Sequence, residues 1–303
     1  MEKGSVLITG GTGLVGRNLT ALLLSEGHSV SHLSRKPVNQ GAVKSYFWDP
    51  GNGIIDTEAF NNVSAIIHLA GAGIANSRWT TGRRSEIVGS RVESAGLIFK
   101  TVSSLEKRPG VFISSSATGI YGSFTSGHIF TETDLPSSDF LGRTCMLWEE
   151  AAGMFSNIGM RTVIIRTGIV LARNEGALKK FTSPAGFGFF PVLGNGRQYL
   201  PWIHITDLAG IYLRAINDLS MKGPYNAVSP EHVTQKEFMR IMARVMKKPF
   251  IHPPVPAFLL KAAMGESSVI ALEGSRVSAS RITDEGFIFR FAGLEQALAD
   301  LLY

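Results

Sequence analysis

The first 27 residues contain the feature that most restricts the fold: an apolar segment, a glycine-rich turn and an amphipathic segment follow one another directly. The apolar segment is Ser5–Gly10, and the amphipathic one, LVGRNLTALLLSEG, runs over Leu14–Gly27 with helical spacing and ends at a glycine. Between them, Gly10, Gly13 and Gly16 allow a tight turn, bare backbone beside a phosphate, and close packing of helix on strand. This pattern predicts a strand, turn and helix that bind the pyrophosphate of a dinucleotide.

Strand-like and helix-like segments then alternate over the first 170 residues. The segment Val63–Gly71 is a continuous apolar run, as expected for a parallel strand buried on both faces, and residues 80–105 form a long helical stretch. GVFISSS predicts the next strand, residues 137–152 the next helix, and RTVIIRTGIVL the strand after that. Such alternation predicts an α/β fold of the Rossmann type, with a doubly wound parallel sheet.

The pattern changes after residue 171, where a stretch rich in glycine, proline and aromatic residues lacks helical periodicity. We therefore expect a dinucleotide-binding domain over residues 1–170, to which about 200–220 return. The remainder of 171–303 is expected to form a smaller C-terminal lobe that binds the substrate.

Composition narrows the classes of function. The 303 residues are 44% hydrophobic and 18% charged, with a net charge of +6 and one cysteine. The basic residues are scattered, which argues against nucleic acid as a partner, and no apolar run reaches the ~20 residues of a membrane helix. A lone cysteine forms no intramolecular disulfide and indicates a reducing cytoplasm. We expect a cytoplasmic protein with a small-molecule substrate and no metal.

The end of the second predicted strand favours one dinucleotide over the other. An NAD site usually has an acidic residue there, about twenty residues after the glycines, to hold the ribose hydroxyls. This chain has Ser34, Arg35 and Lys36 instead. Because a guanidinium can hold a 2′-phosphate that a carboxylate would repel, the sequence predicts NADP(H). The alternative is that both basic residues form a solvated turn.

With these residues in place, the chain resembles the extended, epimerase-like branch of the short-chain dehydrogenase/reductase superfamily. The matching blocks are TGGTGLVG, IIHLAGAG, FISSSATGIYG, IIRTGIVL and WIHITDLA, and further segments resemble the group named "epimerase family protein" or NAD-dependent epimerase/dehydratase-like. The resemblance implies that Leu69, Ala70 and Gly71 lie beside the cofactor. Relatives of this kind often dimerise through their long helices, so the resemblance also makes a homodimer possible. Together with the glycine turn it gives these cofactor-binding residues: Thr9, Gly10, Gly13, Leu14, Val15, Gly16, Ser34, Arg35, Lys36, Leu69, Ala70, Gly71 and Ser115.

The resemblance also implies a catalytic serine, tyrosine and lysine, and here the chain departs from the pattern. Ser116 is the best match for the serine, with Ser115 next. No tyrosine has a lysine four residues later; Leu141 and Cys145 stand in their places. The thiol is expected to be part of the core, because no histidine or nucleophile motif adjoins it.

Several residues are candidates for the missing proton-transfer group. Tyr121 follows the serines, and we take Ser116 and Tyr121 as the candidate catalytic residues. The alternative for Tyr121 is a structural side chain packed over the cofactor. Glu149 and Glu150 lie one helical turn beyond Cys145, as surface residues or as pocket groups.

Cations and an aromatic residue near the expected pocket mouth suggest an anionic substrate. Arg78, Trp79 and Arg197, together with His204, are the candidate substrate residues, and Arg91 belongs to the same segment. Each arginine alone could equally be a surface salt-bridge partner. His204 and nearby Asp207 could instead stabilise the junction between the two lobes.

Two functions remain open from the sequence. One is an NADP(H)-dependent oxidoreductase or epimerase whose Tyr-x-x-x-Lys pair has been replaced and whose substrate is an anionic or nucleotide-linked small molecule. The other is a catalytically weak or inactive NADP(H)-binding redox sensor. General acid/base help worth about 10²–10⁴ in rate would be lost with the pair, while hydride transfer remains the chemistry of the cofactor.

Overall fold

The computed structural model describes residues 4–39, 41–75 and 77–303, and its centre is a sheet of eight strands. The strand order is β12-β8-β6-β5-β1-β2-β3-β4, and all neighbours are parallel except β3 and β4. The strands are β1 (Ser5–Thr9), β2 (Ser29–Ser34), β3 (Lys44–Asp49), β4 (Ile54–Ile55), β5 (Val63–His68), β6 (Val111–Ala117), β8 (Arg161–Thr167) and β12 (Gly223–Ala227).

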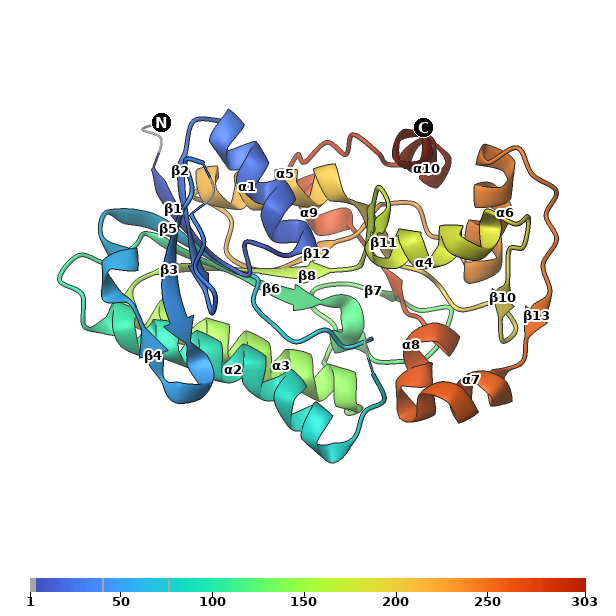
Figure 1. The fold of residues 1–303 in the computed structure, drawn as a ribbon, viewed down its shortest axis with the longest axis horizontal. Helices are drawn as coiled ribbons and strands as arrows, with labels where there is room; N and C mark the ends of the chain where they lie inside the picture. Colours follow the sequence, from blue (N-terminus) through green and yellow to red (C-terminus); the bar gives the residue numbers. More distant parts are fainter. Residues whose placement is uncertain (1–3, 40, 76) are drawn as a thin grey trace.

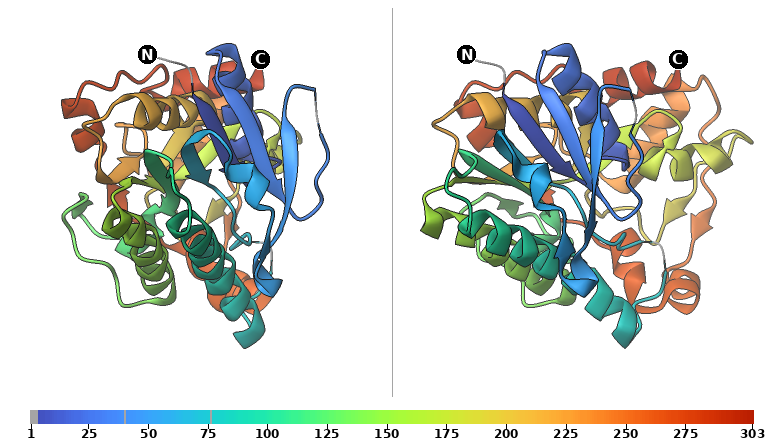
Figure 2. Two further views of the ribbon diagram at one scale, coloured as in Figure 1. Left: turned by 90° about the vertical axis from the view of Figure 1, so that its left-hand side faces the viewer. Right: turned by 60° about the vertical axis from the view of Figure 1, so that its left-hand side comes forward.

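Helices cover both faces of this sheet. Helices α1 (Leu14–Ser25) and α5 (Ile205–Asn217) pack together on one face, and α2 (Thr81–Ser103) and α3 (Phe140–Gly153) on the other (Figures 1 and 2). The predicted Rossmann-type, doubly wound α/β fold is confirmed. No helix of the described ranges is long and apolar enough to cross a membrane.

The apolar runs of the central strands explain why two helical layers form. Alternate side chains of a strand point to opposite faces, so a run without polar interruptions buries both. On β1, Val6 and Ile8 pack towards Leu19 of α1, whereas Leu7 packs in a second core with Phe155, which follows α3.

The strand order changes direction beside β1. The chain passes from β1 to β2 on one side, then crosses back to β5 on the other side of β1. The loops after β1 and β5 therefore diverge, and a crevice opens at the carboxyl ends of these two strands, where ligands bind in open α/β sheets.

The C-terminal part forms a separate small core at one end of the sheet, to the right in Figure 1. Helix α6 (Gln235–Val245) packs there against α10 (Leu294–Leu302). The short pair of β9 (Ile169–Ala172) and β11 (Trp202–His204) adjoins α4 (Gly176–Ala185). Residues 205–227 return to the large sheet as α5 and β12. The remaining elements are β7 (Ile129–Phe130), β10 (Val192–Leu193), β13 (Pro254–Val255), α7 (Ala257–Met264), α8 (Val269–Leu272), β14 (Arg276–Val277) and α9 (Ser280–Asp284).

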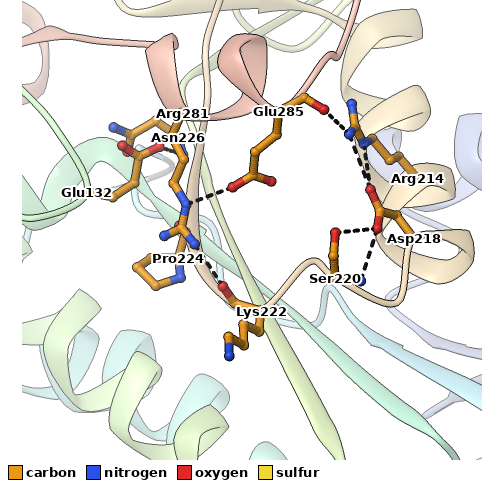
Figure 3. A network of polar contacts seen from close by, with 9 residues as sticks. All are labelled: Glu132, Arg214, Asp218, Ser220, Lys222, Pro224, Asn226, Arg281 and Glu285. Atoms are coloured by element: carbon orange, nitrogen blue, oxygen red, sulfur yellow. Dashed lines mark hydrogen bonds and ion pairs between the residues drawn. The ribbon is translucent and has the colours of Figure 1, made fainter.

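A polar network fastens the C-terminal part to the edge strand β12 (Figure 3). Arg281 of α9 donates to the carbonyl oxygens of Pro224 at 2.7 Å and Lys222 at 3.1 Å. Arg214 of α5 pairs with Asp218 at 3.2 Å and also donates to the carbonyl oxygen of Glu285. These contacts fix α9 beside the strand whose outer edge would otherwise be unpaired.

Candidate functional site

The glycine turn has the geometry that the sequence predicts. Gly10 adopts a φ of +70°, and its carbonyl oxygen accepts from the amide of Gly13 at 3.0 Å. A Cβ on Gly16 would meet the Gly10 carbonyl oxygen and would lie 2.6 Å from Cα of Gly11. Only glycine at position 16 therefore lets α1 pack this closely against the turn.

The start of α1 is free to receive an anion. Its N-cap residue, Gly13, has no side chain to occupy the first amide groups, and no acidic residue lies in the first turn. The N–H groups around Leu14, Val15 and Gly16 and the positive end of the helix dipole therefore point to the crevice. This is the arrangement that binds a diphosphate in dinucleotide sites.

Thr9 holds the two loops of the crevice together. Its hydroxyl oxygen accepts from the amides of Leu69 and Ala70, both at 3.1 Å, and donates to Nδ1 of His68 at 2.8 Å. Nε2 of His68 lies 3.1 Å from the Ser94 hydroxyl of α2. Because that hydroxyl donates to the carbonyl oxygens of Ser90 and Arg91, we assign the ring proton to Nε2. Neutral imidazole fits this chain of contacts, and complete burial lowers the pKa of His68 to about 4.

This histidine predicts a loss of stability in mild acid. Above pH 6.5 the ring is neutral in both the folded and the unfolded chain; below it, only the unfolded chain binds the proton until the pH nears 4. We expect this residue to remove on the order of 3 kcal/mol of unfolding free energy between pH 6.5 and 4. Urea unfolding across this range should show a steeper decline for the native sequence than for His68→Gln; equal slopes would contradict the assignment.

The residues after β2 lie at the same edge of the sheet. The Ser34 hydroxyl accepts from the Lys36 amide at 3.1 Å and donates to the Lys36 carbonyl at 3.0 Å, which shapes a tight turn. Arg35 and Lys36 are exposed there, next to the strand that carries the glycine turn. They are therefore accessible to a phosphate on the adenosine ribose.

Arg17 is a residue of this region that the sequence interpretation missed. Its guanidinium donates to the carbonyl oxygen of Thr12 at 2.6 Å and pairs with Glu175 at 2.5 Å. The contact fastens the loop between β9 and α4 over the glycine turn. No local pattern signals it, because the two partners are 158 residues apart.

A cavity of about 220 Å³ opens at the carboxyl ends of β6 and β8. The sheet contributes Ala117, Thr167 and Gly168, and the 3₁₀ helix Thr118–Tyr121 contributes Thr118. The C-terminal part closes the other side with residues from three segments: Tyr199, Leu200, Pro201, Val269, Ile270, Glu273, Gly274 and Ser275. The cavity thus lies between the large sheet and the smaller lobe.

Leu141 and Cys145 both line this cavity, so the two replacements stand in its wall. Burial, with a smaller effect of the Glu149 carboxylate, raises the pKa of Cys145 to about 12. A thiol in such surroundings is inert, in agreement with the expected core role.

We expect Cys145 to resist alkylation in the folded chain. With a pKa of about 12, only about one thiol in 10,000 is ionised at pH 8. Iodoacetamide should therefore modify the native protein at least 100-fold more slowly than the same chain in urea, as measured by mass spectrometry. Comparable rates in both states would show a reactive thiol.

Ser116 belongs to a buried polar network behind the cavity wall. Its hydroxyl donates to Glu149 at 2.7 Å, and Glu149 forms a two-pronged ion pair with Arg166 at 2.9 and 2.8 Å. Ser116 and Arg166 are direct neighbours in the register of β6 and β8, so both point to the face that α3 covers. Burial lowers the pKa of Arg166, but Glu149 outweighs it, and the net pKa is raised. Ser115 lies on the opposite face of β6.

Tyr121 is the far end of the same network. Its side chain is 1% exposed, donates to Asn226 at 2.6 Å and accepts from Arg166 at 3.0 Å. Burial raises the pKa of its phenol to about 12. Neither Ser116 nor Tyr121 is among the residues that line the cavity. These contacts are those of a buried side chain in a polar network.

The structure does not bring the four candidate substrate residues together in the cavity. Exposed Arg78 donates to the carbonyl oxygens at the end of α7, including Ala263 at 2.9 Å. Buried Trp79 donates to the carbonyl of Ile74 at 2.9 Å, and Arg197 is exposed. His204 is 2% exposed and accepts from the Thr206 amide as the N-cap of α5.

The geometry of His204 is that of a junction residue. Its ring stacks on Phe291 with centroids 3.9 Å apart and lies 3.4 Å from the carboxylate of Asp300 in α10. Nearby Asp207 accepts from the amides of Arg290 and Phe291 at 2.7 and 3.0 Å. Both residues therefore tie α5 to the C-terminal segment, the alternative considered for them.

Residues other than the four candidate substrate residues line the cavity. Arg91 of α2, Thr118 and Thr144 line it, with Tyr199 and Glu273 from the smaller lobe. Thr118 lies within the FISSSATGIYG block and Thr144 within the helix predicted over residues 137–152. Within the described ranges, no group of three or more potential metal ligands occurs.

The fold and the crevice define a Rossmann-type dinucleotide-binding protein. The chain belongs to the NAD dependent epimerase/dehydratase family, whose model matches residues 6–228. Residues 255–301 match a second model, described as a domain of unknown function (DUF1731). The resemblance inferred from the motifs is thereby confirmed.

Relatives extend over almost the whole chain. The Bacillus subtilis epimerase family protein YfhF is 32% identical over 300 residues, covering 98% of both chains. The human epimerase family protein SDR39U1 is 31% identical, covering 98% of this chain and 99% of its own. A crystal structure of human SDR39U1 with NADPH matches with a TM-score of 0.86 and 30% identity, over 98% of each chain.

Proposed function

We propose that this protein is an NADP(H)-dependent hydride-transfer enzyme acting on a small molecule bound in the cavity at the carboxyl ends of β6 and β8. The observation that carries the proposal is the free N-terminus of α1, reached through a turn in which Gly16 admits no side chain. The match to human SDR39U1, described with NADPH, supports the same cofactor.

Different residues bind the phosphates, the nicotinamide and the substrate. The amides of Leu14–Gly16 hold the diphosphate, and Arg35 holds the 2′-phosphate. The nicotinamide, which supplies or accepts the hydride, enters the cavity beside Gly168, one of the lining residues at the carboxyl end of β8. The substrate occupies the side towards the smaller lobe. Tyr199 and Glu273 line that side of the cavity and are the groups that can pass a proton to or from the substrate.

Arg35→Ala tests the choice of cofactor. Loss of a bidentate phosphate contact should weaken NADPH binding at least tenfold and leave NADH binding unchanged, as measured by calorimetry. Arg143→Ala, an exposed arginine of α3, is the matched control and should change neither value. Equal affinity of the native protein for NADPH and NADH would rule out the assignment.

A redox sensor remains the second candidate, and one observation favours it. Tyr121 lies outside the cavity lining, and the two positions of the absent pair are occupied by Leu141 and the inert Cys145. Oxidation of NADPH with a panel of ketones, quinones and sugar nucleotides distinguishes the functions. Turnover supports the enzyme; a complete lack of turnover, with a partner that binds the NADP⁺ and NADPH forms unequally, supports the sensor.

A further inference from the structure

The cavity contains one cation, and its setting is unusual. Arg91 of α2 is the only lysine or arginine among the described residues that line the cavity, and it is 9% exposed. It donates to the carbonyl oxygens of Ile87 at 2.7 Å and Ala72 at 3.0 Å. Its guanidinium lies over the ring of Trp148, 4.8 Å from the centroid. The side chain is therefore held in one orientation from three directions.

The charge of Arg91 has no counter-ion. Within residues 4–39, 41–75 and 77–303, no carboxylate lies within 4.0 Å of it. The carboxylate of Glu149, one helical turn from Cys145, is engaged by Arg166 and Ser116. A guanidinium stays charged even when buried, and a buried charge without a partner is costly. Two of its five N–H groups reach backbone carbonyls, which leaves donors for a ligand.

A second donor in the same wall also lacks an acceptor. Trp148 is 6% exposed and lines the cavity, and its indole nitrogen has no hydrogen-bond partner within the described residues. Buried donors of this kind are rare in native proteins. This nitrogen is shielded from the cavity, so the guanidinium is the group that favours a ligand, and it favours a negative one.

The rest of the lining restricts the body of that ligand. Ile74, Leu141, Ile169, Leu200, Val269 and Ile270 present apolar surface. Because most of the lining surface is apolar, a ligand with an apolar body fits the cavity better than a sugar covered with hydroxyl groups. Glu273 is the one acid of the described lining, and Thr125 donates to it through its amide and its hydroxyl. A single cation balances one negative charge, so a monoanion fits better than a phosphate dianion.

We propose that the substrate is a small carboxylic acid with an apolar body, whose carboxylate is held by the free N–H groups of the Arg91 guanidinium. The inference rests on the proposed function, because it assigns the substrate of the same cavity. It replaces the broader class of anionic or nucleotide-linked molecules with monocarboxylates. Arg91 is a binding residue in this account and has no part in hydride transfer.

The test compares acids with their amides, which share shape but lack the charge. Benzoate and benzamide, and hexanoate and hexanamide, are titrated by calorimetry into the native protein saturated with NADP⁺, with inorganic phosphate as a separate probe. We expect at least one acid to bind ten or more times more tightly than its amide. Amides that bind as tightly as both acids, or phosphate that binds more tightly than either acid, would overturn the proposal.

Variants then test whether the Arg91 guanidinium is the group that recognises the carboxylate. Arg91→Met should abolish the preference for the acid, Arg91→Lys should keep part of it, and Lys100→Met, at the exposed end of the same helix, should leave it intact. If Arg91→Met keeps the preference, the proposal fails. If it weakens NADPH binding instead, Arg91 serves the cofactor, which also overturns the proposal. Failure of the native protein to bind NADPH contradicts the proposed function and is a separate result.

Discussion

Replacing Gly16 with valine is expected to weaken NADPH binding at least 100-fold. The first atom of any side chain at this position would meet the backbone of Gly10 and Gly11, which cannot yield as a flexible side chain does. Helix α1 must then move away from the turn, and its amides leave the diphosphate position. Calorimetry with NADPH measures the loss, and circular dichroism verifies that the variant is folded.

A graded series separates this effect from general damage. Gly13→Ala would place its Cβ 3.2 Å from the Gly10 carbonyl and should weaken binding less than Gly16→Val. Gly96→Ala on α2 would meet no atom within 4 Å and should leave binding unchanged. If Gly16→Val binds NADPH like the native protein, the phosphates lie elsewhere and the crevice is not the cofactor site.

The largest effect on stability is expected from Arg166→Met. The ion pair with Glu149 is buried, with side chains 6% and 12% exposed, so removal of one partner leaves a buried charge without compensation. The unfolding free energy should fall by about 3–5 kcal/mol. The double variant Glu149→Gln/Arg166→Met should recover part of this loss, because it removes both charges. Urea denaturation followed by circular dichroism measures all three proteins.

An exposed pair provides the control. Arg244 and Glu295 are 3.0 Å apart on the surface, and their side chains are 63% and 57% exposed. Arg244→Met should cost at most about 1 kcal/mol, as is usual for exposed pairs. A similar small cost for Arg166→Met would mean that the buried network contributes little to stability.

The fold could be predicted from the sequence because its signals are local. The glycine turn and the uninterrupted apolar runs fix a strand, a turn and a helix without reference to distant residues. Long-range pairing carries no such signal. Arg166 reads as one polar residue within a buried strand, and only the packing of α3 on β6 and β8 shows that Glu149 is its partner. A lone arginine in an apolar run indicates that its charge is costly without a partner, but the run does not indicate which residue is that partner.

The candidate site was harder to predict for the same reason. Arg78, Arg197 and His204 are of the right chemical type, but type does not determine the direction in which a side chain points. His204 turns inward as the N-cap of α5, whereas Arg91 points into the cavity from the middle of a long helix. That direction depends on the packing of α2 against α3, to which no short motif corresponds.

A crystal structure of the protein with bound NADP⁺ would locate each part of the cofactor. We predict the diphosphate on the amides of Leu14–Gly16, the 2′-phosphate at Arg35 and the nicotinamide in the cavity beside Gly168. A cofactor whose diphosphate lies away from the start of α1, or whose nicotinamide lies outside that cavity, would contradict this prediction.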